Sequence, residues 1–242
     1  RDLHLSIRRQ RQMCIRDSSM GVENYLLSIF RLKEEGNTVT ISSLALHLKT
    51  LPIGEGIGTS LPSVGGMVRR LVREGFVTID EQKKEVNFTK SGYTNAETIV
   101  KRHRLAERLV VDMFDVELYR AHTEAHLLEH AISSYLETKI LSKLGNPSTS
   151  PYGYPIPGSN YVLNKKAVRI SQLKSNTRIK IDRIPADDMS LLKYLVDNRL
   201  TPGNSVIVVD NNKSTGTISL SSSGIESVLS VDVAELVWGI PE

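Results

Sequence analysis

The chain has 242 residues, of which 24% are charged and 40% hydrophobic, and its formal net charge is +4. That length allows two or three small domains, and the composition is that of an ordinary water-soluble protein. No apolar run reaches the roughly 18 residues that a membrane-spanning helix needs, and the single cysteine, Cys14, excludes a disulfide framework and favours a reducing cytoplasm.

Residues 1–19 hold five Arg and two Asp, so they carry +3 of the net charge. The segment has no apolar core and is therefore not a signal peptide. Because amphipathic patterning begins only after Met20, we expect residues 1–19 to be a non-native leader. A basic arm that contacts nucleic acid is the alternative. The rest of the chain carries only +1, so the overall charge says little about partners.

The first expected domain, residues 20–95, contains three helices followed by two strands. Apolar residues recur with a helical period in three segments: 20–36, 41–48 and 62–75. A loop rich in glycine, residues 51–60, separates the second segment from the third. Strands are expected at 76–80 and 85–89, joined by a polar turn. This order of elements is that of a winged helix-turn-helix.

Basic side chains stand on the third helix and at the tip of the hairpin, two places where such a fold could meet a DNA duplex. A solvated surface is the alternative, because residues 20–95 hold nine Lys/Arg against eight Asp/Glu. Two glycines in the third helix cost roughly 1 kcal/mol each in helix propensity. They fit either a close approach to the DNA backbone or weakened DNA binding. The DNA-binding candidates are Ser63, Gly65, Gly66, Arg69, Arg70, Lys83 and Lys84.

Four of the six histidines fall within residues 103–130, on two predicted helices at 92–112 and 117–135. Residues three or four apart on a helix share one face, so their side chains can close on a small cation. Imidazole and carboxylate groups bind divalent metals such as Mn²⁺, Fe²⁺, Co²⁺ and Zn²⁺. A lone histidine is more often a solvated side chain, but a cluster on neighbouring helices favours metal binding. The candidate ligands are His103, Glu107, His122, His126, Glu129 and His130.

Two other functions are compatible with this cluster. Residues 126–130 match H-x-x-E-H, a pattern in which two histidines bind zinc and the glutamate acts as the base of a hydrolase. Alternatively, a permanent structural metal could pin the two helices together without any sensing. The helical segment offers little room for a substrate cleft, so we expect a metal-binding protein that is not an enzyme.

The remaining chain divides at a proline-rich stretch. A short helix is expected at 137–144, and residues 146–158 hold four prolines and two glycines, which disfavour helix and sheet. We therefore expect a helical domain at 96–145, a linker at 146–165 and a small β-barrel at 166–242. The expected strands of the barrel are 168–170, 178–183, 205–210, 217–220 and 234–238. One helix, at 187–197, interrupts them.

Three stretches carry a resemblance to a known family: residues 101–109, 121–130 and 150–158. In this order and spacing they resemble the iron- and manganese-dependent regulators typified by the diphtheria toxin repressor. The resemblance implies a mainly α protein with a winged helix-turn-helix, a helical dimerisation domain and a C-terminal SH3-like small β-barrel. It also implies a transcriptional repressor that controls metal homeostasis genes and binds a palindromic double-stranded DNA operator as a homodimer.

The resemblance further implies two metal sites per subunit for Mn²⁺ or Fe²⁺, with Zn²⁺ or Co²⁺ as substitutes in vitro. One implied site consists of His103, Glu107, His122 and, from the barrel, Asp188 or its neighbour Asp187. The other implied site consists of His126, Glu129, His130 and Asn24. Position 126 is often Cys in this family and position 24 Met or Asp. The nitrogen and amide donors present here disfavour Cu(I) and are compatible with Mn²⁺ or Fe²⁺. Residues 51–60 resemble an insertion relative to the family.

Overall fold

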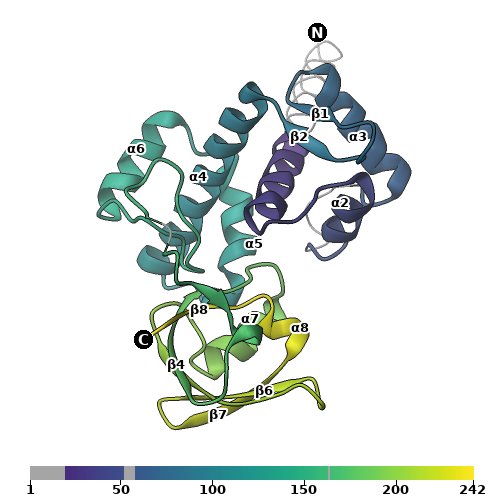
Figure 1. Ribbon diagram of the computed structural model, residues 1–242. Coiled ribbons are helices and arrows are strands. Elements are labelled where there is room, and N and C mark those ends of the chain that lie inside the picture. Colours follow the sequence, from purple (N-terminus) through teal and green to yellow (C-terminus); the bar gives the residue numbers. More distant parts are fainter. Residues whose placement is uncertain (1–19, 52–57, 163) are drawn as a thin grey trace. The chain divides into compact units, whose positions relative to one another are not determined.

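The computed structural model describes residues 20–51, 58–162 and 164–242 (Figure 1). The chain forms two compact units, the first ending at Lys101 and the second beginning at Arg102. The expected leader and most of the expected insertion after the second helix lie outside the described residues. Within the described residues, no helix is both long and apolar enough to cross a membrane.

The first unit has the element order that the sequence predicts. A helix at residues 20–34 is followed by α2 (Ile41–Leu48) and α3 (Leu61–Arg73). The strands β1 (Val77–Ile79) and β2 (Val86–Phe88) then form an antiparallel hairpin. The helices bury their apolar faces together with the hairpin in one core, which confirms the predicted helical periods.

Side-chain caps determine where two of these helices begin. The hydroxyl of Thr40 accepts a hydrogen bond from the Ser43 amide, and the Ser43 hydroxyl accepts one from the Thr40 amide, which makes a capping box at the start of α2. Ser60 caps α3 by accepting from the Ser63 amide. Pro62 follows in the first turn, where the helix requires no amide donor.

One long helix is shared by the two units, and two shorter helices follow it in the second unit. The long helix α4 (Lys90–Phe114) contributes its first turns to the first unit and the remainder to the second. It is followed by α5 (Leu118–Glu129) and α6 (Ser134–Lys143). These helices carry all the candidate metal ligands expected between residues 103 and 130, either within a helix or at its cap.

The helix expected to run to residue 135 is shorter in the structure. It ends at Glu129, where His130 is the C-cap of α5. Ser133 then caps the next helix by accepting a hydrogen bond from the Leu136 amide. An N-cap side chain within an amphipathic pattern thus starts a second helix, and the expected boundary between the two helices was wrong.

The C-terminal part of the second unit is a six-stranded antiparallel sheet with the strand order β3-β8-β4-β5-β6-β7. Its strands are β3 (Val168–Arg169), β4 (Thr177–Arg183), β5 (Ser205–Asn212), β6 (Thr217–Ser222), β7 (Ile225–Ser230) and β8 (Trp238–Pro241). Within the described residues the end strands β3 and β7 do not pair, so the sheet is open, whereas the sequence predicted a small, partly closed barrel. Helices α7 (Met189–Asp197) and α8 (Val231–Ala234) complete the unit, with a short 3-10 turn, η2 (Ile170–Gln172), after β3.

Two strand predictions near the C-terminus were wrong. Strand β7 was missed; it follows β6 through a tight turn in which Ser223 and Gly224 both have positive φ. The range 234–238, expected as a strand, instead holds the last residue of α8, a turn and the first residue of β8. Ser230 caps α8 by accepting a hydrogen bond from the Val233 amide. The last strand begins only at Trp238.

The helices and the sheet of the second unit share a hydrophobic core. Val110 of α4 and Ala121 of α5 are buried in the same apolar cluster as Ile179 and Ile181 of β4. Helix α5 also lies against α7. Residues 102–145 and 166–242 thus both belong to the second unit, and the sheet can hold groups close to α5.

Gly92 in the first turn of α4 is a sensitive position of the fold. A Cβ atom there would lie 1.8 Å from the backbone oxygen of Phe76, so even a methyl group needs backbone movement. We expect Gly92→Ala to lower the free energy of unfolding by about 1–3 kcal/mol, measured by urea denaturation. The matched control is Gly66→Ala in α3, where a Cβ atom meets nothing within 4 Å. That change should stabilise the protein by up to about 1 kcal/mol, and equal stabilities of the two variants would contradict the packing described.

Candidate metal centre and nucleic-acid interface

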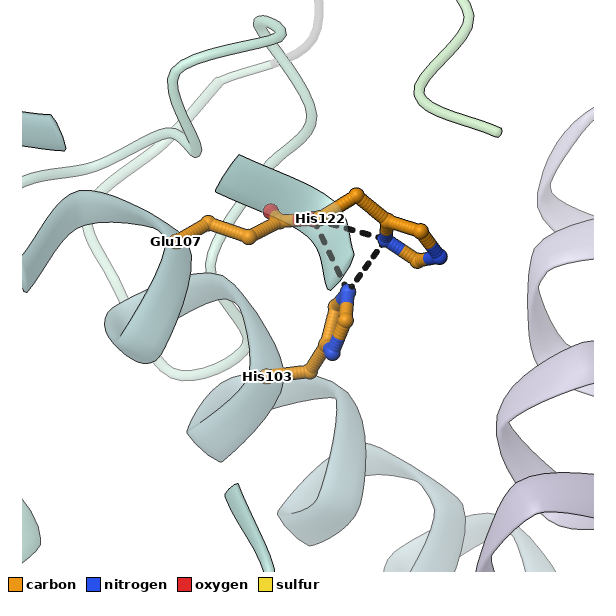
Figure 2. A group of neighbouring side chains, drawn as sticks. All are labelled: His103, Glu107 and His122. Carbon is orange, nitrogen blue, oxygen red and sulfur yellow. Dashed lines mark hydrogen bonds and ion pairs between the residues drawn. The ribbon is translucent and has the colours of Figure 1, made fainter. Parts of the chain in front are cut away.

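Two adjacent helices bring three buried side chains together (Figure 2). His103 and Glu107 lie one turn apart on α4, and His122 reaches them from α5. The Nε2 atom of His103 lies 2.8 Å from Glu107 Oε1 and 3.0 Å from His122 Nδ1. We call these three residues the first group. Each offers one donor atom, and the three atoms lie within 4.8 Å of one another.

The other ring nitrogen of His103 faces a second set of donors. Its Nδ1 atom forms an ion pair with Glu129 Oε2, and His126 Nδ1 lies 3.0 Å from Glu129 Oε1. His103, His126 and Glu129 are all buried and have donor atoms within 4.8 Å of one another; we call them the second group. His130 lies beside them, with Nε2 at 3.4 Å from Glu129 Oε1. His103 therefore belongs to both groups, whereas the sequence analysis assigned it to one.

Opposite charges outweigh the cost of burial in this cluster. Burial lowers the pKa of His103, but the carboxylates of Glu129 and Glu107 together raise that pKa to about 10. Burial raises the pKa of Glu129, but His103 and then His126 bring it down to about 2. The same balance, dominated by His103 and then His122, holds the pKa of Glu107 far below its usual value. At neutral pH the metal-free cluster thus contains a protonated imidazole between two carboxylates.

These pKa shifts give the stability of the metal-free protein a defined pH dependence. The raised pKa of His103 contributes stability that is fully present below 6.5 and is lost as the pH rises through about 10. The lowered pKa of Glu129 contributes stability that is present above 4.5 and is lost as the pH falls through about 2. Both contributions are therefore complete between pH 4.5 and 6.5.

The donor set fits a divalent cation. Within the described part of the chain, the buried Nε2 atom of His122 makes no hydrogen bond, and Figure 2 shows it directed away from the first group. Asp187 Oδ1 lies 3.6 Å from this nitrogen. An imidazole that binds a metal through one nitrogen commonly donates its other N–H to a carboxylate. The first group thus has nitrogen and oxygen donors on one side of His122 and a carboxylate on the other.

Asp188, the sheet-domain ligand first expected from the resemblance, has a different environment. Its side chain caps α7, accepting hydrogen bonds from the amides of Ser190 and Leu191 at 2.9 and 3.0 Å. A carboxylate that accepts two backbone hydrogen bonds is held at the helix end. The structure therefore places Asp187, rather than Asp188, beside the cluster. No sequence pattern distinguishes the two adjacent aspartates. Only the position at which α7 begins shows that Asp188 is its N-cap.

The candidates for contact with DNA lie in the first unit, as does Asn24, which is buried on the helix of residues 20–34. Ser63 and Arg69 are exposed on α3, and Lys83 and Lys84 are exposed in the turn between β1 and β2. Lys84 has a positive φ of 55°, which fits its place in a tight turn. These side chains could meet phosphates without first losing a buried contact.

Three other candidates on α3 are less exposed. Gly66 is partly exposed, whereas Gly65 is buried, and a Cβ atom there would lie 3.3 Å from Arg69 Nη1 and 4.0 Å from Ile41 of α2. The first contact is with the flexible end of Arg69 and the second is an ordinary van der Waals contact, so packing does not require a glycine at position 65. Arg70 is partly buried and donates to Glu74 at 2.7 Å on the same helix. A surface ion pair between residues one helical turn apart contributes little to stability, so Arg70 can exchange Glu74 for a phosphate at small cost.

The raised pKa of His103 predicts that metal competes with a proton. Since the pKa is about 10, binding of an ion at His103 Nε2 near neutral pH must release about one proton. We expect the apparent affinity for Mn²⁺ to rise by up to about tenfold per pH unit between pH 6.5 and 9. Isothermal titration calorimetry in buffers of different ionisation enthalpy measures both the affinity and the proton release. Affinity independent of pH, with no proton released, would contradict this electrostatic description.

Comparison with known proteins supports a single family. A family model described as "Iron dependent repressor, metal binding and dimerisation domain" matches residues 89–158, and the FeoA domain matches residues 168–241. The iron-dependent repressor IdeR of Mycobacterium leprae is 30% identical over 219 residues, which cover 85% of this chain and 90% of the relative. The diphtheria toxin repressor of Corynebacterium diphtheriae is 30% identical over 226 residues, covering 89% and 94%.

Solved structures agree with these relatives. A manganese-dependent transcriptional repressor in complex with manganese superposes with a TM-score of 0.78 at 28% identity, covering 91% of this chain and all of that one. These proteins are transcriptional repressors, which argues against the zinc hydrolase considered for residues 126–130. The chain belongs to the diphtheria toxin repressor family of iron- and manganese-dependent transcriptional repressors.

Proposed function

We propose that this protein is a cytoplasmic repressor that binds its DNA operator as a homodimer when Mn²⁺ or Fe²⁺ occupies the buried cluster. The observation that carries this proposal is the buried set of imidazole and carboxylate donors around His103. Buried charged groups are costly unless they are paired or coordinate a metal. This cluster of imidazole and carboxylate donors is therefore suited to bind an exchangeable divalent cation.

The first group would hold one ion through His103 Nε2, a carboxylate oxygen of Glu107 and His122 Nδ1. Asp187 would then accept a hydrogen bond from the other nitrogen of His122 and fix the orientation of the ring. Nitrogen and carboxylate donors without sulfur suit Mn²⁺ and Fe²⁺, and Zn²⁺ or Co²⁺ can replace them in vitro. When bound, the ion supplies a positive charge that takes the place of the proton on His103.

The second ion would use His126, Glu129 and His130. Only the family resemblance adds Asn24 to this set, and by that resemblance Asn24 would link metal binding to the DNA-binding domain. Linkage requires the ion to bind the DNA-competent arrangement more tightly, and DNA must tighten the binding of the ion by the same factor. Asn24 brings no charge, so its contribution to this coupling is expected to be smaller than that of a carboxylate.

The first unit would act as a winged helix-turn-helix. Helix α3 would enter the major groove, with Ser63, Gly66 and Arg69 on the side facing the DNA, while Lys83 and Lys84 of the hairpin contact phosphates. Two copies would place their recognition helices one helical turn apart, about 34 Å, on a palindromic operator. The helix and hairpin order and the exposure of these side chains support this assignment.

An exposed apolar surface in the second unit suits contact with a second copy of the chain. Four side chains on the end of α5 and the start of α6 are exposed: Leu127, Leu128, Tyr135 and Leu136. They lie within residues 89–158, the segment that matches the metal binding and dimerisation domain. Contiguous exposed apolar side chains commonly mark protein interfaces. We therefore assign the dimer interface to this surface.

Metal-dependent DNA binding tests the proposed function. In a gel-shift or fluorescence anisotropy assay with the promoter region of its own gene, we expect Mn²⁺ or Fe²⁺ to raise the affinity by at least about tenfold over EDTA, within the usual range of allosteric coupling. His130→Ala should remove most of this gain because it deletes a donor of the second ion. Circular dichroism of the EDTA-treated protein is the control: the helices must remain folded. Unchanged operator binding after chelation would rule out a metal switch, and unfolding on chelation would indicate a structural metal.

A charge placed in the proposed interface tests the dimer. Leu127 is 69% exposed, so Leu127→Glu should not disturb the folded monomer, but it would bury a carboxylate at the contact between two copies. We expect sedimentation velocity to show a monomer and DNA affinity to fall. Val228→Glu, a similar change at a 54% exposed residue of β7, is the control and should leave the dimer intact. A Leu127→Glu variant that still dimerises would place the interface elsewhere.

A further inference from the structure

The proline-rich segment of residues 146–158 is firmly attached to the helices that carry the cluster. Arg104 of α4 donates a hydrogen bond to the backbone oxygen of Pro155. One turn further along α4, Arg108 donates to the backbone oxygen of Thr149 at 2.7 Å. Hydrogen bonds from charged donors are stronger than neutral ones. The segment is therefore a fixed part of the second unit as well as a connector between its helices and its sheet.

Tyr152, in the middle of this segment, reaches into the first turn of α5. Its side chain is fully buried. Its hydroxyl accepts a hydrogen bond from the His122 amide at 3.0 Å and donates one to the Leu118 carbonyl at 2.8 Å. In a regular α-helix these two backbone groups, four residues apart, are each other's partners. The Tyr152 hydroxyl thus contacts both backbone groups of the helical turn that ends at the proposed ligand His122.

The backbone of Tyr152 contacts the strand that leads to Asp187. Its carbonyl oxygen accepts a hydrogen bond from the Ile184 amide at 3.0 Å. A Cβ atom on the next residue, Gly153, would lie 2.0 Å from the Asp182 carbonyl oxygen, so the segment packs directly on the end of β4. Three residues after Ile184, Asp187 places its carboxylate 3.6 Å from His122 Nε2. Tyr152 therefore touches both the backbone of His122 and the chain that presents Asp187.

We propose that Tyr152 is a positioning residue for metal binding: its hydroxyl sets the place of the His122 imidazole in the first group, and its backbone sets that of Asp187. The inference rests on the proposed function, because it gives Tyr152 a role only if His122 binds metal. Without the hydroxyl, the first turn of α5 loses its side-chain hydrogen bonds at the His122 amide and the Leu118 carbonyl. The backbone that carries His122 is then free to shift, which moves the imidazole relative to His103 Nε2 and Glu107.

The test compares two tyrosines of the same segment. Tyr152→Phe removes the hydroxyl and keeps the buried ring, whereas Tyr154→Phe removes a hydroxyl from a ring that stacks on Arg104. Mn²⁺ binding is measured by isothermal titration calorimetry, and the constant followed is the one that His122→Ala abolishes or weakens most. We expect Tyr152→Phe to weaken this constant by about tenfold, as for other residues that orient a metal ligand. Tyr154→Phe should change it by less than about twofold, which lies within the ±0.5 kcal/mol expected for neutral sites.

A double-mutant cycle separates positioning from general destabilisation. If Tyr152 acts through His122, Tyr152→Phe should have no further effect on Mn²⁺ affinity in a His122→Ala background. An equal loss in both backgrounds would overturn the inference, and so would an unchanged affinity of Tyr152→Phe alone. If His122→Ala itself leaves Mn²⁺ binding unchanged, the proposed metal group fails and the inference fails with it. That result differs from a failure of Tyr152 alone.

A second readout does not depend on bound metal. Hydrogen exchange of the His122 amide in the metal-free protein reports the bond to the Tyr152 hydroxyl. We expect Tyr152→Phe to change this exchange rate and the ¹⁵N chemical shifts of the His122 ring, while exchange at α6 stays the same. Changed exchange throughout the second unit would indicate loss of packing instead and would count against the assigned role.

Discussion

The second unit depends on one interaction, the protonated imidazole of His103 between the carboxylates of Glu107 and Glu129. Taking such charges out of water costs several kcal/mol per ion, so each must find a partner inside the protein. Counting only these three groups, one positive and two negative charges leave a net charge of −1. A divalent cation that displaces the proton on His103 therefore improves the charge balance, and the same network that stabilises the metal-free protein prepares it for metal.

The rest of the unit holds this network in place. The spacing of His103 and Glu107 on α4 supplies one side, and α5 supplies the other. The cap that Asp188 gives α7 leaves Asp187 at the end of the preceding loop, next to His122. The shared apolar core of helices and sheet makes these distances a property of one packed body. The sheet therefore supports the cluster, whatever else it does.

Much of this could be predicted from local sequence, because helix periodicity, caps and the four-residue spacing of ligands are local properties. The order of elements in the first unit and the convergence of His103, Glu107 and His122 were predicted correctly. The membership of His103 in both donor groups was not predicted, because it depends on how α4 and α5 pack against each other. Tyr152 was missed as a contact of His122, and Asp187 was named only as the alternative to Asp188. The reason is the same: long-range packing selects one of two adjacent aspartates and one hydroxyl in a proline-rich segment.

The central claim is that a divalent cation takes the place of a proton inside this buried cluster. Anomalous diffraction at the manganese edge, from crystals of the protein grown with Mn²⁺, tests it most directly. The account predicts an anomalous peak within coordination distance of His103 Nε2, Glu107 and His122 Nδ1. A cluster that keeps its ion pairs intact, with manganese bound only elsewhere on the protein, would contradict it.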